Sequence, residues 1–367
     1  MNDANFERWA NVIVSYSLGV KPEEKVAVVG DVTAEPLLRA IGKEVLDAGG
    51  YPVVIPTLRG QQADLLMYGS DAQLSYLSPL ETFARLEADC LAIVAADANT
   101  RSLSEVDPAR QLFHRAARAE MNKQYMQRAA KGEMRWSLTM FPTDAYAQDA
   151  GMSTEAFSAF LYSACKLDQL DPAAAWRELS KEQQRLIDWL TPRSTIHVTG
   201  PGTDLTVETG GRTWINSDGK RNFPSGEVFT GPVETSANGH VRFSFPVVTS
   251  GHEIADIRLR FENGVVVEAS AAKDEEYLLS MLDSDPGARR LGEFAFGTNF
   301  GITKFTKQIL LDEKIGGTIH MALGAGYPDS GSTNLSSIHW DMICDIRQGG
   351  RVTVDGEDFL VDGRYVI

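Results

Sequence analysis

The spacing of hydrophobic residues changes character near the middle of the chain. In the first half, short apolar runs alternate with segments whose apolar residues recur every three or four positions, as in amphipathic helices. The expected strands are residues 25–29, 52–55, 90–95 and 135–140. Apolar strands that alternate with helices form mostly parallel sheets covered on both faces. The first half is therefore predicted to be an α/β domain.

From about residue 195 the apolar runs become shorter and are separated by turn dipeptides. Residues 257–261 and 265–269 flank an Asn-Gly pair, which favours the positive φ angles of a two-residue hairpin turn. Helices are expected around residues 275–282 and 303–311. This pattern predicts an α+β domain with a largely antiparallel sheet.

The boundary between the two patterns falls at Thr191-Pro192, because a proline ends a helix and disfavours the helical conformation of the residue before it. A chain of 367 residues is long enough for two domains. The predicted domains are residues 1–192 and 193–367.

Composition and charge exclude several classes of partner. The chain has 50 acidic and 35 basic residues, a net charge of −15, which disfavours binding to nucleic acid or anionic lipid. No apolar run reaches the ~18–20 residues of a membrane span. The segment after the first strand, Gly30–Glu35, lacks a dinucleotide or P-loop fingerprint. Three cysteines without a C-x-x-C pair and a polar start without a secretory signal predict a cytoplasmic protein.

His339-Trp340-Asp341 is the first candidate for chemistry. In a β-strand, residues two apart point to the same face, so His339 and Asp341 would lie side by side. An imidazole and a carboxylate on one rigid face suit a divalent metal ion. The triplet alone is a weak signal, because carboxylates often bind buried histidines without a metal. The other histidines at positions 114, 197, 240 and 252 show no ligand spacing.

Two acids stand in apolar, strand-like surroundings. Glu227 begins the run Glu-Val-Phe-Thr, and Glu293 lies within Leu-Gly-Glu-Phe-Ala-Phe-Gly. Such carboxylates are expected to be buried and then need a cation or hydrogen bonds. Asp312-Glu313 precedes Lys314 and is as compatible with a helix-terminal charge pair as with a ligand role.

Five motifs follow one another in the C-terminal half: Gly226-Glu227-Val228-Phe229-Thr230, Leu291-Gly292-Glu293, Asp312-Glu313, His320-Met321-Ala322-Leu323-Gly324 with Tyr327-Pro328, and Ser337-Ile338-His339-Trp340-Asp341. In this order they resemble the thermophilic metalloaminopeptidase family. The likeness extends over nearly the whole chain. It implies an exopeptidase that removes N-terminal residues from short peptides, with two divalent ions (zinc, cobalt or magnesium) per chain, and a homodimer.

The resemblance also implies residue roles. Family ligands match Glu227, Glu293, His320, His339 and Asp341, and a further acid of the site matches Glu313. Tyr327 matches a tyrosine beside the metals, where its hydroxyl would donate to the developing oxyanion. A carboxylate such as Glu227 or Glu313 would accept the proton of a bridging water.

An alternative function belongs to another enzyme class. The same fold family includes dihydroxypyridine dioxygenases with one Fe(II) ion, and His320, His339 and Asp341 alone would form a two-histidine, one-carboxylate iron site. The dioxygenases are expected to lack acids that match Glu227 and Glu293. Because this chain keeps both, the sequence favours the peptidase.

Overall fold

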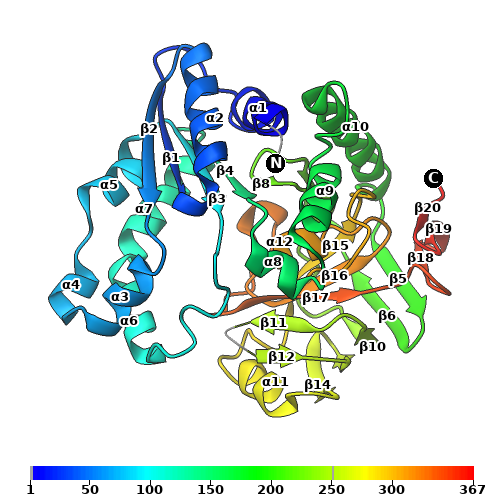
Figure 1. Cartoon of the computed structure of the whole chain (residues 1–367). Helices are drawn as coiled ribbons and strands as arrows, with labels where there is room; N and C mark the ends of the chain where they lie inside the picture. The colour runs from blue at the N-terminus through cyan, green and yellow to red at the C-terminus, as the bar shows by residue number, and fades with distance from the viewer. Residues whose placement is uncertain (1–2, 250–251) are drawn as a thin grey trace. The chain divides into compact units, whose positions relative to one another are not determined.

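The computed structural model describes residues 3–249 and 252–367 and divides into two compact units. The first unit contains the chain up to Ala175 together with Gly219–Pro224. The second contains Trp176–Asp218 and Ser225–Ile367. Figure 1 follows the chain through both units.

The first unit is built around a parallel sheet of five strands. In sheet order the strands are β2 (Tyr51–Thr57), β1 (Lys25–Asp31), β3 (Cys90–Ala95), β4 (Arg135–Met140) and β8 (Asn222–Phe223). The four longer strands include the apolar runs that the sequence indicated. The predicted parallel α/β architecture is confirmed.

Helices cover both faces of this sheet. The helices of the first unit are α1 (Asp3–Asn11) with the π-helix η1 (Val12–Ser17), the 3-10 helix η2 (Val32–Ala34), α2 (Glu35–Asp47), α3 (Gln61–Tyr68), α4 (Asp71–Ser75), α5 (Pro79–Thr82) with the π-helix η3 (Phe83–Glu87), α6 (Pro108–Ala117), α7 (Ala119–Ala130), α8 (Asp144–Asp149) and α9 (Thr154–Ala164). Leu38 of α2 lies against Gly30 on one face of β1. On the other face, Ala27 packs in a cluster with Ala84 of η3 and Tyr125 of α7.

The second unit contains two larger antiparallel sheets and a two-stranded one. The eight-stranded sheet has the order β14 (Val265–Ser270), β13 (Ile257–Glu262), β10 (Asn238–Phe243), β6 (Thr203–Glu208), β5 (Thr195–Gly200), β18 (Arg351–Val354), β19 (Glu357–Val361), β20 (Arg364–Tyr365). The five-stranded sheet has the order β17 (His339–Cys344), β16 (Ile319–Gly324), β15 (Leu291–Gly297), β9 (Glu227–Thr230), β7 (Ile215–Ser217). The small sheet pairs β11 (Val247–Thr249) with β12 (His252–Ile254).

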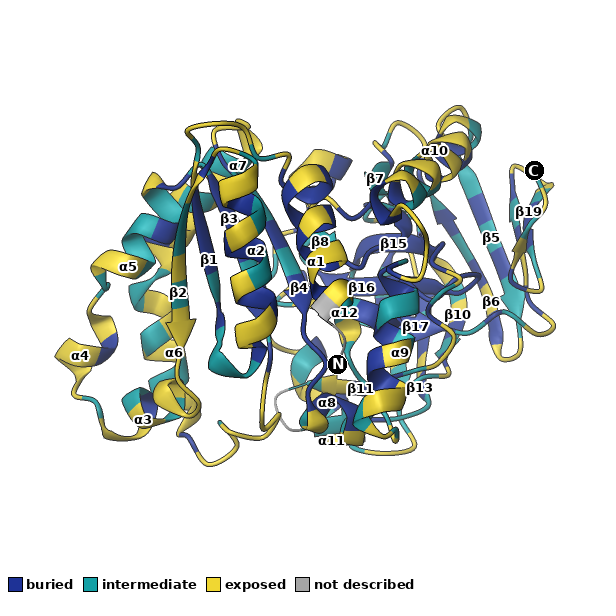
Figure 2. Ribbon diagram, turned by 45° about the horizontal axis from the view of Figure 1, so that its top comes forward, coloured by how far each residue is buried: buried dark blue, intermediate teal, exposed yellow. Residues whose placement is uncertain are grey.

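The helices of the second unit are few and mostly short. They are α10 (Pro172–Leu190, of which Trp176 onward belongs to this unit), α11 (Glu275–Leu282), α12 (Ile309–Asp312) and the 3-10 helix η4 (Pro328–Ser330). One hydrophobic core joins residues of α10, α11 and both large sheets. Figure 2 shows β15 and β16 in dark blue because every residue of both strands is buried. The predicted β13–β14 hairpin is present, and Asn263 and Gly264 have φ angles of 49° and 79°.

Two details differ from the sequence prediction. Along the chain, the boundary between the compact units falls after Ala175 and not at residue 192. Leu186, Ile187 and Leu190 of α10 pack into the core of the second unit. Residues 219–224 return to the first unit because β8 pairs with β4.

The helix expected around residues 303–311 is wrong except for the short α12. Asp312 Oδ1 accepts hydrogen bonds from the backbone N–H and the hydroxyl of Thr306, at 2.7 and 2.8 Å. Lys307 has a φ angle of 64°. These side-chain to backbone bonds fix the preceding segment as a loop. Among the described residues, no helix is both long and apolar enough to cross a membrane.

Candidate metal centre

Strand register brings the candidate ligands of β16 and β17 to one face of the five-stranded sheet. Ala322 pairs with Asp341, and Gly324 pairs with His339. Paired residues share a face, and side chains alternate along each strand. His320, two residues before Ala322, therefore lies on the same face as both. His339 and Asp341 do lie on a strand, β17 (His339–Cys344), so the condition for their sharing a face is met.

The acids of β15 and β9 occupy the same face. Glu293 pairs with Ala322, and Ala295 pairs with His320. Glu227 pairs with Gly297 at the other end of β15. All five residues from the strands thus project from one surface of a single rigid sheet.

The opposite face of these strands is apolar. Phe294, Phe296, Met321, Trp340 and Met342 alternate with the polar residues and belong to the core of the second unit. Alternation between a polar and an apolar face therefore fixes which residues can reach the centre, since a shift of one residue in register would exchange the two faces.

Glu227, Glu293 and His320 form the buried part of the cluster. His320 Nε2 lies 3.2 Å from Glu227 Oε2 and 3.2 Å from Glu293 Oε1. The three side chains each offer a ligand atom within 4.8 Å of the others. The backbone of Glu227 is held in place by Gln183 of α10, whose side-chain amide donates to the Glu227 carbonyl.

A second group overlaps the first at His320. It contains Glu313, His320 and Asp341, again with ligand atoms within 4.8 Å of one another. His339 Nε2 lies 3.5 Å from Asp341 Oδ2 and 3.7 Å from Glu293 Oε2. His339 Nδ1 is 2.7 Å from the carbonyl oxygen of Ala325, an arrangement that orients the ring and directs Nε2 toward the carboxylates.

Three buried atoms of this cluster have no hydrogen-bond partner among the described residues: Glu227 Oε2, Asp341 Oδ1 and His320 Nδ1. The short approach of His320 to Glu227 lacks hydrogen-bond geometry. A buried carboxylate oxygen without a protein donor needs a cation or an ordered water beside it. Imidazole and carboxylate donors together suit zinc, cobalt and related divalent ions. The residues present therefore fit a metal centre.

The pKa shifts indicate an excess of negative charge. Burial raises the pKa of Glu293, and the charges of Asp341 and Glu227 raise it further. Burial lowers the pKa of His320, but the facing carboxylates of Glu227 and Glu293 outweigh that effect and raise it to about 9. Burial likewise opposes the effect of Asp341 and Glu293 on His339, whose pKa is raised overall. Bound cations would relieve the same excess.

Lys314 is a residue of the cluster that the sequence analysis missed. Its side chain is fully buried, and its ammonium contacts Glu313 Oε1 and lies 3.7 Å from Glu227 Oε1. Although burial raises the pKa of Glu227, the Lys314 ammonium and His320 lower it overall. The run Glu-Lys-Ile-Gly-Gly resembles an exposed helix end, so the sequence carried no signal that Lys314 is buried.

Tyr327 lies at the accessible side of the cluster. Its side chain is 45% exposed, and its ring centre is 5.1 Å from that of His339 and 5.6 Å from that of Phe229. The loop that carries it, residues 325–338, connects β16 to β17. The predicted site residues thus come together, with Tyr327 beside His339.

Glu234 anchors this loop. Its Oε1 accepts hydrogen bonds from the N–H and the hydroxyl of Thr333, at 2.7 and 3.0 Å. Its Oε2 lies 2.5 Å from Arg212 Nη2. Burial raises the pKa of Glu234, but these donors lower it to about 2.

We expect Glu234→Gln to destabilise the protein by about 1–3 kcal/mol, because glutamine has one uncharged acceptor oxygen in place of two and its NH2 group cannot accept the bonds from Arg212 or Thr333. Because the folded-state pKa is depressed, the contribution of Glu234 is present above the unfolded pKa near 4.5 and is lost as the pH falls toward 2. Urea unfolding at pH 7 measures the loss. Glu262→Gln, in an exposed pair with Arg260, is the control. Equal losses in both variants would contradict the anchoring role.

The sequence matches a known family over almost its whole length. Residues 2–363 fit the model of the thermophilic metalloproteases (M29). The chain is 28% identical over 401 residues to aminopeptidase 2 of Geobacillus stearothermophilus, covering 97% of this chain and 95% of that one. It is 34% identical over 235 residues to aminopeptidase T of Thermus aquaticus, covering 56% and 55% of the two chains.

Two solved structures have a similar fold. Wild-type AmpT from Thermus thermophilus superposes with a TM-score of 0.84 at 25% identity, covering 99% of both chains. A 2,5-dihydroxypyridine dioxygenase from Pseudomonas putida has a TM-score of 0.64 at 14% identity, covering 100% of this chain and 98% of that one, a likeness of fold alone. The family predicted from the motifs is confirmed: the chain belongs to the thermophilic metalloproteases (M29), a metalloaminopeptidase family, and is a metal-dependent hydrolase.

Proposed function

We propose that this metallopeptidase removes N-terminal residues from short peptides with a centre of two divalent ions. The relatives named as aminopeptidases support the reaction. The observation that carries the two-ion centre is the pair of overlapping ligand groups, Glu227–Glu293–His320 and Glu313–His320–Asp341. A tetrahedral ion takes four ligands, fewer than this cluster offers. With His339, which contacts Asp341 and Glu293, the cluster offers six side chains.

The proposed ligands are Glu227, Glu293, His320, His339 and Asp341, with Glu313 as the additional acid. Divalent ions held there would lower the pKa of a bound bridging water toward 7 and polarise the scissile carbonyl. The sheet supplies rigidity, because the five strand residues are fixed by main-chain pairing and by the apolar core behind them.

Glu313 would accept a proton, and Tyr327 would stabilise the oxyanion. Glu313 is the better placed of the two acids to accept a proton, since its side chain is 14% exposed and that of Glu227 only 6%. Lys314 contacts one oxygen of Glu313 and holds the carboxylate in place. Tyr327, on the accessible side near His339, would donate its hydroxyl proton in a hydrogen bond to the oxyanion.

The cluster has more acids than the alternative function requires. A single Fe(II) ion would be satisfied by His320, His339 and Asp341. Glu227 and Glu293 would then remain buried beside His320 without a role. We therefore prefer the peptidase. A homodimer and a cytoplasmic location complete the proposal and follow from the family resemblance and the composition.

Metal removal tests this function directly. We expect chelation to abolish hydrolysis of leucyl-p-nitroanilide and zinc, cobalt or magnesium to restore it, because the carboxylates need the ions to bind and activate water. Elemental analysis of the purified protein should give about two divalent ions per chain, as the proposed pair of ligand groups requires. Activity unaffected by a chelator, or one iron per chain with ring cleavage of a dihydroxypyridine, would refute the proposal.

A further inference from the structure

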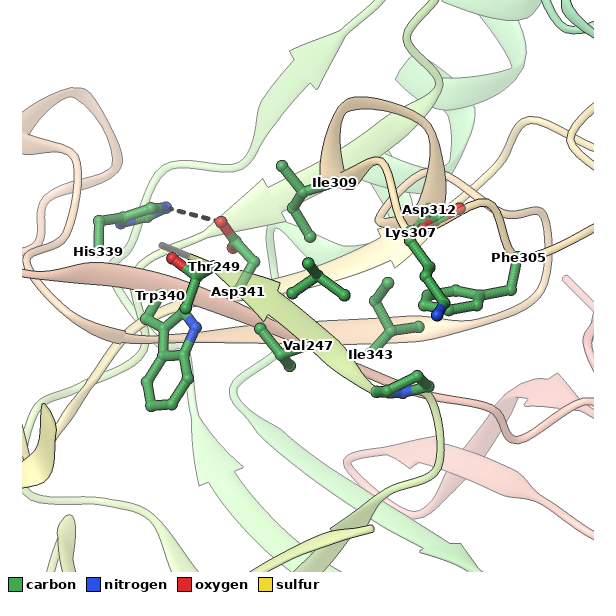
Figure 3. Close-up of a pocket in the computed structure, with 12 residues that line it drawn as sticks. Val247, Thr249, Phe305, Lys307, Ile309, Asp312, His339, Trp340, Asp341 and Ile343 are labelled. Atoms are coloured by element: carbon green, nitrogen blue, oxygen red, sulfur yellow. Dashed lines mark ion pairs between the residues drawn. The ribbon is translucent and has the colours of Figure 1, made fainter. Parts of the chain in front are cut away.

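A pocket opens directly beside the cluster. It has a volume of about 150 Å³, and His339 and Asp341 form part of its wall. Figure 3 shows these two residues at one end and Phe305, Lys307 and Asp312 at the other. A cavity of roughly this volume accommodates a benzene-sized group. The pocket can therefore hold one side chain of medium size.

The walls between the two ends are apolar. Val247, Val248, Ile309 and Ile343 line this part of the pocket. They come from β11, from α12 and from β17, so three separate elements create the surface. An apolar side chain placed here would remove both its own surface and the apolar pocket wall from water, which is the source of hydrophobic binding energy.

The charges at the far end are already engaged. Phe305 stacks on Phe245 with ring centres 4.8 Å apart, so this end is held in place. Lys307 Nζ donates to Glu253 Oε2 at 2.7 Å. Asp312 Oδ1 accepts two bonds from Thr306. Neither charged group is left without a partner to attract an ionic side chain.

We propose that this pocket binds the side chain of the substrate's N-terminal residue and selects apolar side chains of about leucine size. The inference rests on the proposed aminopeptidase function. The residue that is removed must place its carbonyl at the metal ligands, so its side chain lies beside them. His339 and Asp341 belong to both the cluster and the pocket. Ile309 and Val248, which are 47% and 44% exposed, are accessible apolar residues of the pocket lining.

Narrowing the pocket should change specificity and leave the chemistry intact. In the wild type we expect kcat/KM for leucyl-p-nitroanilide to exceed that for the alanyl compound by roughly 10–100-fold. Ile309→Trp should reduce this ratio to about 1, mainly by lowering the leucyl value. Val248→Trp, on a different element, should act in the same direction. Val267→Trp, at a 42% exposed position on β14 outside the pocket lining, is the matched control.

A second substrate series locates the side chain. Dipeptides of the form Ala-X vary only the residue after the scissile bond, and we expect their relative rates to be the same in the wild type and in Ile309→Trp. Titration calorimetry measures the binding of free leucine to the enzyme without turnover. The affinity for leucine should fall at least tenfold in Ile309→Trp.

Three results would overturn the assignment. They are an unchanged leucyl-to-alanyl ratio in both tryptophan variants, a change confined to the Ala-X series, or a wild-type preference for lysyl or glutamyl substrates. If the wild type with metal cleaved none of the substrates, the proposed function itself would fail.

Discussion

Glu227→Gln should reduce kcat/KM for leucyl-p-nitroanilide by more than about 100-fold and lower the bound metal. Changes in groups that merely orient a ligand cost 10–100-fold, so the loss of a ligand is expected to exceed that range. Glu227 offers a buried oxygen without a hydrogen-bond partner, and an amide oxygen there would lack the charge that balances a cation. Activity assays and elemental analysis on the same preparation measure both effects.

A comparison with Glu313→Gln distinguishes a proton acceptor from a metal ligand. If Glu313 accepts a proton and is not an essential ligand, this variant should keep most of its metal and lose most of its activity. Both variants should remain folded, as circular dichroism would verify, since glutamine has the shape of glutamate. Wild-type activity in Glu227→Gln would place the catalytic centre elsewhere in the chain.

Lys314→Met should destabilise the metal-free protein by about 3–5 kcal/mol, because it removes one partner from a buried ion pair. The ammonium of Lys314 lies between Glu227 and Glu313, and methionine fills a similar space without charge. With saturating metal the loss should be much smaller, because bound cations neutralise the same carboxylates and stabilise the folded state. Denaturant unfolding with and without chelator gives both values.

Lys304→Met provides the control for Lys314, since Lys304 is exposed in the same unit. We expect it to change stability by less than about 0.5 kcal/mol in either condition. A loss in Lys314→Met that is the same with and without metal would mean that Lys314 contributes to the fold independently of the metal centre.

Much of the fold could be predicted because its determinants are local. The apolar runs at residues 90–95 and 135–140 became parallel strands, and the Asn-Gly pair became the turn of the β13–β14 hairpin. The loop before α12 could not be predicted. Its conformation depends on hydrogen bonds from Thr306 to Asp312, which form only once the chain has folded back on itself. The boundary of the first unit could not be predicted either, because it depends on which of the two units α10 packs into.

The candidate site was likewise predictable only in part. The sequence by itself determined the family and the residue types, because Glu227, Glu293, His320, His339 and Asp341 each stand in a recognisable motif. Only the tertiary structure decided that these strands pair in a register that places all five on one face. It alone revealed the burial of Lys314 and the pocket beside His339. Register, burial and cavities arise from contacts between residues that are distant in the chain, and a linear pattern does not record them.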